Sequence, residues 1–325
     1  MVTKAHNLKI KNNKFRKSLS LEKQIVKKRY EVVYDETFET NVPGTAAHII
    51  HQTKNFLRSK KILDLGCGAG RLSLFASKYA NEVLGIDYVE KAISFATNFA
   101  KITNRNNVKF TVADLDDFSG EKFDVILISD VLQHVDKPLQ TLKKSHKLLK
   151  NNGIVIISIP NFNNFRGHVW LTLQSLFNLP MSLTDTYQIT SEEMNRLSIK
   201  SEFDIIKTTG YSYEWGWTDW AIEDLQRRTK LALIDAKMDR DIKTENFNLW
   251  LKSNYEFNDT FIKFLQTKKI LKKRPTTKIL DIPNNIPKKV KEYLDDGNSK
   301  INMLYSNIEP FNKMGAGTIY VLKKR

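Results

Sequence analysis

The sequence predicts a doubly wound α/β fold built on a mostly parallel sheet, and three observations predict it. Short apolar runs alternate with helix-like amphipathic runs between residues 44 and 210. A glycine-rich turn, residues 66–70, joins the first apolar run to the helix-like run that follows. Acidic residues stand where the next apolar runs end, at Asp87, Asp114 and Asp130. Sheets of this kind bind ligands beyond the carboxyl ends of their strands, so a site is predicted there.

The first strand and its turn carry the most specific signal. Residues 62–75 read ILDLGCGAGRLSLF, an apolar strand followed by a tight turn and a helix start. Glycine lets the backbone turn sharply and lets a ligand approach without meeting a Cβ atom. The helix start is expected to offer backbone N–H groups to that ligand. The third glycine, Gly70, comes one residue earlier than in the nicotinamide fingerprint, and Arg71 holds that fingerprint's glycine position.

Further strands and helices follow in alternation. The next predicted strands occupy residues 82–87, 108–114, 123–130 and 153–159. Helical patterns occupy residues 44–57, 91–101 and 138–150. The fourth strand is almost continuously apolar, as expected of a strand buried on both faces. Asp87 lies 21 residues after Gly66, close to the ~20 expected for an acid that binds ribose hydroxyls.

Together these segments resemble the class I S-adenosylmethionine (SAM)-dependent methyltransferases, with 62–70 in the place of their first motif. The resemblance implies a Rossmann-like methyltransferase fold with a seven-stranded sheet, and an enzyme whose cofactor is S-adenosyl-L-methionine. In that family the Asp114 position binds the adenine amino group and the Leu115 position supplies a backbone contact. The implied cofactor-binding residues are Asp64, Gly66, Cys67, Gly68, Gly70, Asp87, Tyr88, Asp114, Leu115, Ser129 and Asp130.

The resemblance also organises the rest of the chain. Residues 187–210, with the predicted sixth strand at 203–210, resemble small-molecule families related to ubiquinone-biosynthesis O-methyltransferases. The final strand, 317–322, is expected antiparallel beside the sixth. The connection between them is far longer than the ~2–5 residues of a hairpin loop, and helical patterns at 220–238 and 246–271 predict a large, mainly helical insertion. The predicted units are a basic N-terminal arm and helix at 1–43, a SAM-binding core at 44–210, the insertion at 211–315 and the final core strand at 316–325.

The implied reaction is transfer of a methyl group to oxygen or nitrogen of a small or medium-sized metabolite by in-line displacement. His134, just past the fourth strand, is the candidate catalytic base, because imidazole titrates near neutrality. A structural role for His134 is the alternative reading. Three tryptophans at 215, 217 and 220 suggest either an aromatic acceptor pocket or a packing anchor. The insertion is interpreted as a lid, a substrate element or a homodimer contact, and these readings stay open.

Charge and composition limit which partners the chain is expected to have. The chain carries 52 Lys and Arg against 36 Asp and Glu, a formal net charge of +16, and residues 1–30 hold ten of the basic residues. An anionic acceptor or an RNA substrate bound by the basic arm explains this excess, and so does the lysine-rich composition expected from an A/T-rich genome. A non-catalytic SAM-fold scaffold is the remaining alternative. No apolar run predicts a membrane span, no metal site is expected, and the single cysteine fits a reducing cytoplasm.

Overall fold

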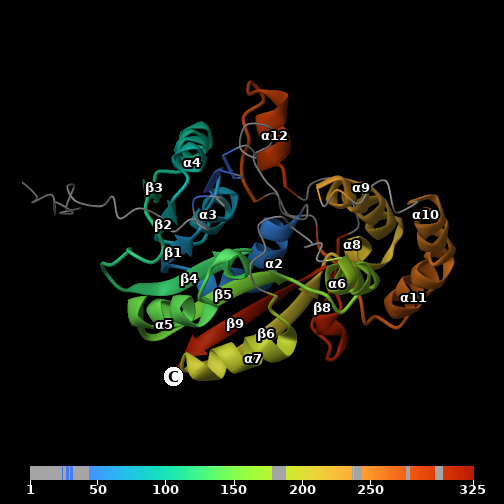
Figure 1. The fold of residues 1–325 in the computed structure, drawn as a ribbon. Coiled ribbons are helices and arrows are strands. Elements are labelled where there is room, and N and C mark those ends of the chain that lie inside the picture. The colour runs from blue at the N-terminus through green and yellow to red at the C-terminus, as the bar shows by residue number, and fades with distance from the viewer. Residues whose placement is uncertain are drawn as a thin grey trace, which may run out of the picture.

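A computed structural model gives the fold (Figure 1). It describes residues 24, 27–28, 30–31, 44–177, 188–235, 237, 244–275, 279–296 and 303–325. Most of the predicted N-terminal arm and of a helix expected at 21–40 therefore lies outside the described residues. Within the described part, no helix is both long and apolar enough to cross a membrane.

The described residues form one mixed sheet of nine strands in the order β3-β2-β1-β4-β5-β9-β6-β8-β7. The five predicted core strands are present and run parallel: β1 (Lys61–Leu65), β2 (Glu82–Asp87), β3 (Val108–Val112), β4 (Phe123–Ser129) and β5 (Leu149–Pro160). As predicted, the last strand, β9 (Gly317–Lys324), runs antiparallel beside the sixth, β6 (Phe203–Tyr211). It lies between β5 and β6.

The predicted count of seven strands is wrong. Two short strands, β7 (Lys272–Lys273) and β8 (Leu304–Ser306), extend the sheet beyond β6. Residues Gly210 and Tyr211 pair with the second of these strands. The reason is physical: an edge strand leaves a row of unpaired backbone groups, and chain segments between β6 and β9 satisfy part of that row.

Helices cover both faces of the sheet, which makes the fold doubly wound (Figure 1). One face packs against α2 (Thr45–Leu57), α3 (Arg71–Ser77) and α4 (Glu90–Ile102), and the other against α5 (Pro138–Leu148) and α7 (Ser191–Lys200). Consecutive residues of β1 pack into the cores on opposite faces of the sheet. Ile62 packs on the side of α2, α3 and α4, and Leu63 packs on the side of α5 and α7. This follows from the two-residue period of a strand and explains why β1 is apolar throughout.

Between β6 and β9 the described residues form α8 (Tyr213–Trp217), α9 (Asp219–Asp235), α10 (Thr244–Ser253), α11 (Tyr255–Thr267) and α12 (Lys288–Leu294). The helix predicted at 220–238 is α9, and its predicted end lies outside the described residues. The single helix predicted at 246–271 is wrong, because the chain breaks at Asn254 into α10 and α11. The Asn254 amide donates to the Trp250 carbonyl at 2.7 Å, a local bond that competes with helix continuation.

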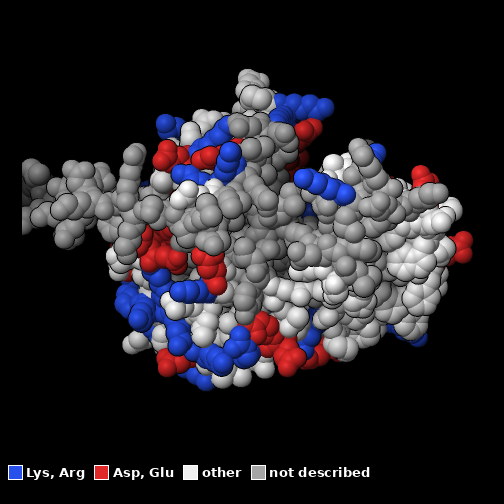
Figure 2. Space-filling model, in the orientation of Figure 1, with Lys and Arg blue, Asp and Glu red and all other residues white. Residues whose placement is uncertain are grey.

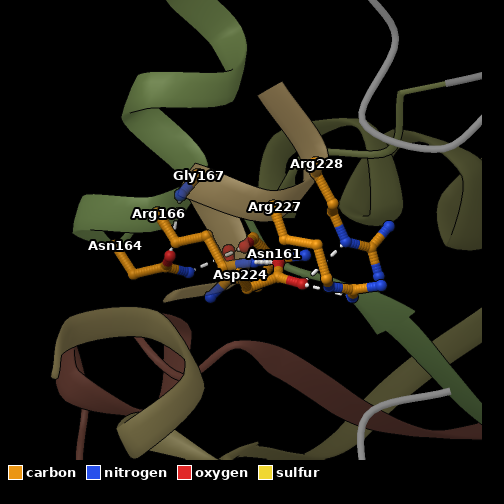
Figure 3. A network of polar contacts seen from close by, with 7 residues as sticks. All are labelled: Asn161, Asn164, Arg166, Gly167, Asp224, Arg227 and Arg228. Carbon is orange, nitrogen blue, oxygen red and sulfur yellow. Dashed lines mark hydrogen bonds and ion pairs between the residues drawn. The ribbon is translucent and has the colours of Figure 1, made fainter. Parts of the chain in front are cut away.

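Two packing features hold this segment against the core. The tryptophans act as anchors: Trp217 donates to the Met314 carbonyl at 2.8 Å and packs on Phe261, while Trp215 packs on Trp220. A network of charged side chains joins α6 (Phe165–Phe177) to α9, as Figure 3 shows. The helices α8–α11 lie beside α6 in Figure 1, whereas α12 stands on the side of α3 and α4.

Candidate cofactor and active site

A cavity opens at the carboxyl ends of β1, β2 and β4, where the parallel sheet was predicted to bind its ligand. The residues that line it are Tyr30, Ala46, Asp64, Gly66, Cys67, Gly68, Ala69, Arg71, Leu72, Asp87, Tyr88, Val89, Ser129, Asp130, Val131, His134, Val135 and Tyr293. Nine of the twelve predicted site residues are among them, including the candidate base His134. The three that do not line it are Gly70, Asp114 and Leu115.

The glycine turn forms the floor of this cavity. Gly66, Gly68 and Gly70 have φ angles of 70°, 53° and 83°, a region in which other residues are strained. The N–H groups of Gly66 and Cys67 both donate to the Ile86 carbonyl, at 2.8 and 3.0 Å. These two amides therefore fasten the turn to β2.

Asp87 ends β2 with its carboxylate held in place by two backbone amides. One oxygen accepts from Gly68 N and the other from Val89 N, each at 2.9 Å. Burial raises the pKa of Asp87, and these hydrogen bonds oppose that rise. Each carboxylate oxygen has a further lone pair, so both can still accept hydroxyl groups from a ligand.

Asp64 lies on β1 directly before the turn and is only 1% exposed. Its carboxylate accepts the Ser73 hydroxyl from α3 at 2.6 Å. Burial, reinforced by the nearby charge of Asp87, raises the pKa of Asp64 to about 7, while the bonds from Ser73 oppose the rise. The group is therefore poised between its neutral and ionised forms near neutral pH, and a cationic ligand would favour the ionised form.

Ser129, Asp130 and His134 form the β4 end of the cavity. Asp130 has a φ of 53°, a strained conformation held by a 2.9 Å bond from its N–H to the Ser158 carbonyl. The hydroxyls of Ser129 and Ser158 lie 2.9 Å apart. Burial raises the pKa of Asp130 to about 6, although a hydrogen bond from the Ser158 side chain opposes it.

His134 ends a short 3-10 helix, Leu132–His134, and its imidazole meets the edge of the Tyr30 ring at a centroid distance of 5.9 Å. The side chain is half-buried at the cavity wall. The sequence placed it correctly past β4, but could not show that an aromatic ring from before residue 44 would lie against it.

Cys67 and Gly70 have structural explanations. Burial raises the pKa of the Cys67 thiol well above its ordinary value, which opposes formation of a reactive thiolate. A Cβ atom on Gly70 would lie 2.6 Å from Phe110 and 2.8 Å from Ala96, so this glycine lets α3 pack closely against β3 and α4. Asp114 accepts the Asp116 N–H at 2.8 Å in the loop after β3. Cofactor contacts of Gly70, Asp114 and Leu115 stay predictions.

His48 and His51, on α2, pack against aromatic rings. His48 is fully buried against the Tyr211 ring, with 5.3 Å between ring centroids, and burial lowers its pKa well below its ordinary value. His51 packs on the Tyr305 ring at 5.5 Å. Across the described residues, no three His, Cys, Asp or Glu side chains are grouped so that they could hold a metal ion.

Reasoning from the sequence missed two features of the cavity. Arg71 was noted only as a departure from the nicotinamide fingerprint, and it lines the cavity. Tyr293 comes from α12, more than 220 residues after the turn, and lines it as well. No local pattern in residues 288–294 indicates that this helix returns to the first strand.

Comparison with known proteins places this site in a family. Residues 57–214 match a family model described as a methyltransferase domain. A ubiquinone biosynthesis O-methyltransferase of Glaesserella parasuis is 29% identical over 175 residues, which cover 50% of this chain and 73% of that protein. One from Actinobacillus pleuropneumoniae is 34% identical over 119 residues, which cover 34% of this chain and 50% of that protein.

Solved structures with a similar fold include the YcgJ protein from Bacillus subtilis, with a TM-score of 0.49 and 14% identity over 86% of this chain and 99% of that one. Magnesium protoporphyrin IX methyltransferase from Synechocystis has a TM-score of 0.45 and 20% identity, over 57% of this chain and 91% of that one. The residues that match the family model include the glycine turn and the strands from β1 to β6. These matches identify residues 57–214 as a methyltransferase domain of the class I SAM-dependent, small-molecule type, and they support an enzyme whose cofactor is S-adenosyl-L-methionine.

Proposed function

We propose that the enzyme transfers the methyl group of S-adenosyl-L-methionine to an oxygen or nitrogen of a small or medium-sized metabolite by in-line displacement. One observation carries the proposal: the β4-end residues Ser129, Asp130 and His134 line the same cavity as the glycine turn. The acceptor and the methyl group would then meet at that end. The cofactor supplies an electrophilic methyl group, and the protein supplies alignment.

The residues of the cavity fit this cofactor. The fixed carboxylate of Asp87 is suited to the two ribose hydroxyls, because both of its oxygens are already oriented by backbone amides. Asp64 is suited to the cationic groups of the cofactor, since a positive charge beside this buried carboxylate would favour its ionised form. A side chain at Gly66 would clash with Val131, because its Cβ atom would lie 2.6 Å from that residue.

His134 is the proposed catalytic base. An acceptor hydroxyl or ammonium group must lose a proton for its lone pair to attack, and imidazole can take that proton near neutral pH. The Tyr30 ring against the imidazole limits its orientation. Asp130, in its strained turn, would then shape the acceptor end of the cavity.

The acceptor is proposed to be a phenol, an amine or a carboxylate-bearing metabolite. The names of the curated relatives favour oxygen as the acceptor atom, because those proteins are ubiquinone biosynthesis O-methyltransferases. The formal net charge of the chain, +16, favours an acceptor with an anionic group. An RNA acceptor has no specific support from the described residues, since the basic arm lies almost wholly outside them.

The segment 211–315 is proposed to contact a second copy of the chain. Its helices α10 and α11 expose several large apolar side chains, Leu249 at 66%, Trp250 at 49%, Phe257 at 71% and Phe264 at 52%. Figure 2 shows the surface over these two helices to be largely uncharged on the side seen there. Exposed apolar side chains of this size favour an interaction surface. Light scattering of the wild type and of Phe257→Glu tests this, with a loss of dimer expected in the variant.

The main test is methyl transfer itself. The full chain is incubated with S-adenosyl-L-methionine labelled in its methyl group, together with phenols, catechols, amines, carboxylates and total RNA in separate reactions. Labelled metabolite and an equal amount of S-adenosylhomocysteine are expected. Asp87→Asn should abolish the reaction, whereas Asp204→Asn should leave it unchanged, because the Asp204 side chain is 61% exposed near the start of β6. Label in RNA alone would contradict a metabolite acceptor.

A further inference from the structure

We infer that Arg71 binds the carboxylate of the cofactor's amino-acid part, and that α12 holds Arg71 in position for this. The inference rests on the proposed placement of the cofactor in the cavity. It extends the cofactor site beyond the Rossmann-like core to a helix of the β6–β9 segment.

Arg71 is suited to an anionic group by its charge and its place. It is the first residue of α3, directly after the glycine turn, and it is 5% exposed. Among the described residues that line the cavity, it is the single Lys or Arg, while Asp64, Asp87 and Asp130 are carboxylates. The amino-acid part of the cofactor carries an ammonium and a carboxylate. The carboxylates of the cavity match the ammonium, and Arg71 matches the carboxylate.

Helix α12 fixes the guanidinium from two sides. The Arg71 Nη1 atom donates to the Tyr293 carbonyl at 2.9 Å. The guanidinium also lies over the Tyr293 ring, with its Cζ atom 4.6 Å from the ring centroid. The ring itself packs on Phe99 of α4, at 5.3 Å. A guanidinium has five N–H donors in a rigid fork. It can therefore donate to the Tyr293 carbonyl and to a ligand carboxylate at the same time.

Asp296 places a negative charge beside the Arg71 guanidinium. Its Oδ2 atom lies 3.7 Å from Arg71 Nε, an ion-pair distance that is longer than a hydrogen bond. The same carboxylate accepts the N–H of Gly44 at 2.5 Å and that of Ala47 at 3.3 Å, at the start of α2. Asp296 is thus shared between a helix start and Arg71, and it anchors the guanidinium from behind without lining the cavity.

The competing reading is that Arg71 only fastens α12 to α3. Both readings predict that removal of Arg71 harms the protein, so activity or stability alone cannot separate them. They differ for a pair of ligands that are matched except for the carboxylate. S-adenosyl-L-methionine has this group and decarboxylated S-adenosylmethionine lacks it.

The test is calorimetric titration of both ligands into the full chain, as wild type and as Arg71→Met. We expect Arg71→Met to weaken S-adenosyl-L-methionine binding about 10- to 100-fold, the range of a lost charged hydrogen-bonded contact. The affinity for decarboxylated S-adenosylmethionine should change by less than about 3-fold. Equal weakening of the two ligands, or no weakening of the first, would overturn the inference. Failure of the wild type to bind either ligand would instead refute the proposed cofactor placement.

Two further variants keep the test decisive. If Arg71→Met does not fold, Arg71→Lys keeps the charge but loses the fork, and a smaller loss confined to S-adenosyl-L-methionine is expected. Arg58→Met is the matched control, because Arg58 also lies over a tyrosine ring, 5.7 Å from the centroid of Tyr79, but does not line the cavity. It should change neither affinity, and a selective loss in this variant would also contradict the inference.

Discussion

The carboxylate of Asp296 accepts a hydrogen bond from the backbone N–H of Gly44 at 2.5 Å, although 252 residues separate the two. Gly44 stands at the start of α2 and has no side chain to cap that helix. The carboxylate replaces the missing cap and places a negative charge at the positive end of the helix. Asp296, two residues after the end of α12, thereby stabilises the start of the Rossmann-like core.

Replacing Asp296 by Asn should lower the free energy of unfolding by about 2–4 kcal/mol. The change removes the charge from the helix start and leaves the buried guanidinium of Arg71 without its carboxylate. Urea denaturation measures the effect. Glu292→Gln is the control on α12, because its side chain is 65% exposed and its pairing with Lys288 is worth about 0.5 kcal/mol or less. Equal stability of the two variants would contradict the capping role.

Gly70 should tolerate no side chain. An alanine there would need a φ of 83° and would bring its Cβ atom 2.6 Å from the Phe110 ring. We expect Gly70→Ala to lower the free energy of unfolding by about 2 kcal/mol or more, from backbone strain and overpacking together. Gly120→Ala is the matched control, since nothing lies within 4 Å of its added Cβ atom. A thermal melt that leaves both variants unchanged would show that the close packing of α3 is not needed.

Asp224 should stabilise the contact between α6 and α9. Its buried carboxylate pairs with three arginines, as Figure 3 shows. The distances from its oxygens to the guanidinium nitrogens are 2.6 Å for Arg166, 2.7 Å for Arg228 and 3.1 Å for Arg227. Burial alone would raise the pKa of Asp224, but the charges of Arg166 and Arg228 hold it below its ordinary value. Its contribution to stability is therefore present above the unfolded pKa of about 3.9 and is lost as pH falls through the lower folded value.

Asp224→Asn should cost about 3–5 kcal/mol at pH 7, because it removes the buried carboxylate that pairs with the buried guanidinium of Arg166. Arg227→Ala should cost less than about 1 kcal/mol, because that arginine is 65% exposed. Urea denaturation at pH 7 compares the two. A small effect of Asp224→Asn would mean that apolar packing alone joins α6 to α9.

The parts of the fold that depend on local pattern were predictable from the sequence. The strands β1 to β5 are apolar runs of strand length, and the glycine turn has a spacing that places its neighbours at one sheet edge. Thr190 shows how local such signals are: a threonine three residues before a glutamate is typical of a helix start, and the Thr190 hydroxyl accepts the Glu193 N–H at 3.1 Å.

Features that depend on a single side-chain bond or on distant contacts were not predictable. The break at Asn254 divides one periodic pattern into two helices. Periodicity alone does not reveal that the Asn254 side chain donates to the backbone carbonyl of Trp250, four residues earlier. The strands β7 and β8 are two and three residues long, and they exist because the edge of β6 is available. Tyr293 reaches the cavity through contacts with Arg71 and Phe99, which no spacing in the sequence encodes.

The affinity for S-adenosyl-L-methionine should depend on pH through Asp64. Its pKa of about 7 means that the carboxyl is largely protonated below neutrality, whereas the cationic cofactor favours the carboxylate. Binding should therefore be tightest above pH 7 and weaken by up to about tenfold for each pH unit below it. Titration calorimetry between pH 5.5 and 8.5, in buffers of different ionisation enthalpy, should also detect about one proton released near pH 6.

Ser73→Ala assigns this dependence to Asp64 and not to Asp130, whose pKa is about 6. The Ser73 hydroxyl donates to Asp64 and opposes the rise in its pKa, so its removal should move the midpoint of the affinity profile to higher pH. Ser77→Ala is the control on the same helix, because that buried hydroxyl donates to the Leu74 carbonyl instead. A midpoint that Ser73→Ala leaves in place would assign the titrating group elsewhere in the cavity, since the only change made is to the hydrogen bonding of Asp64.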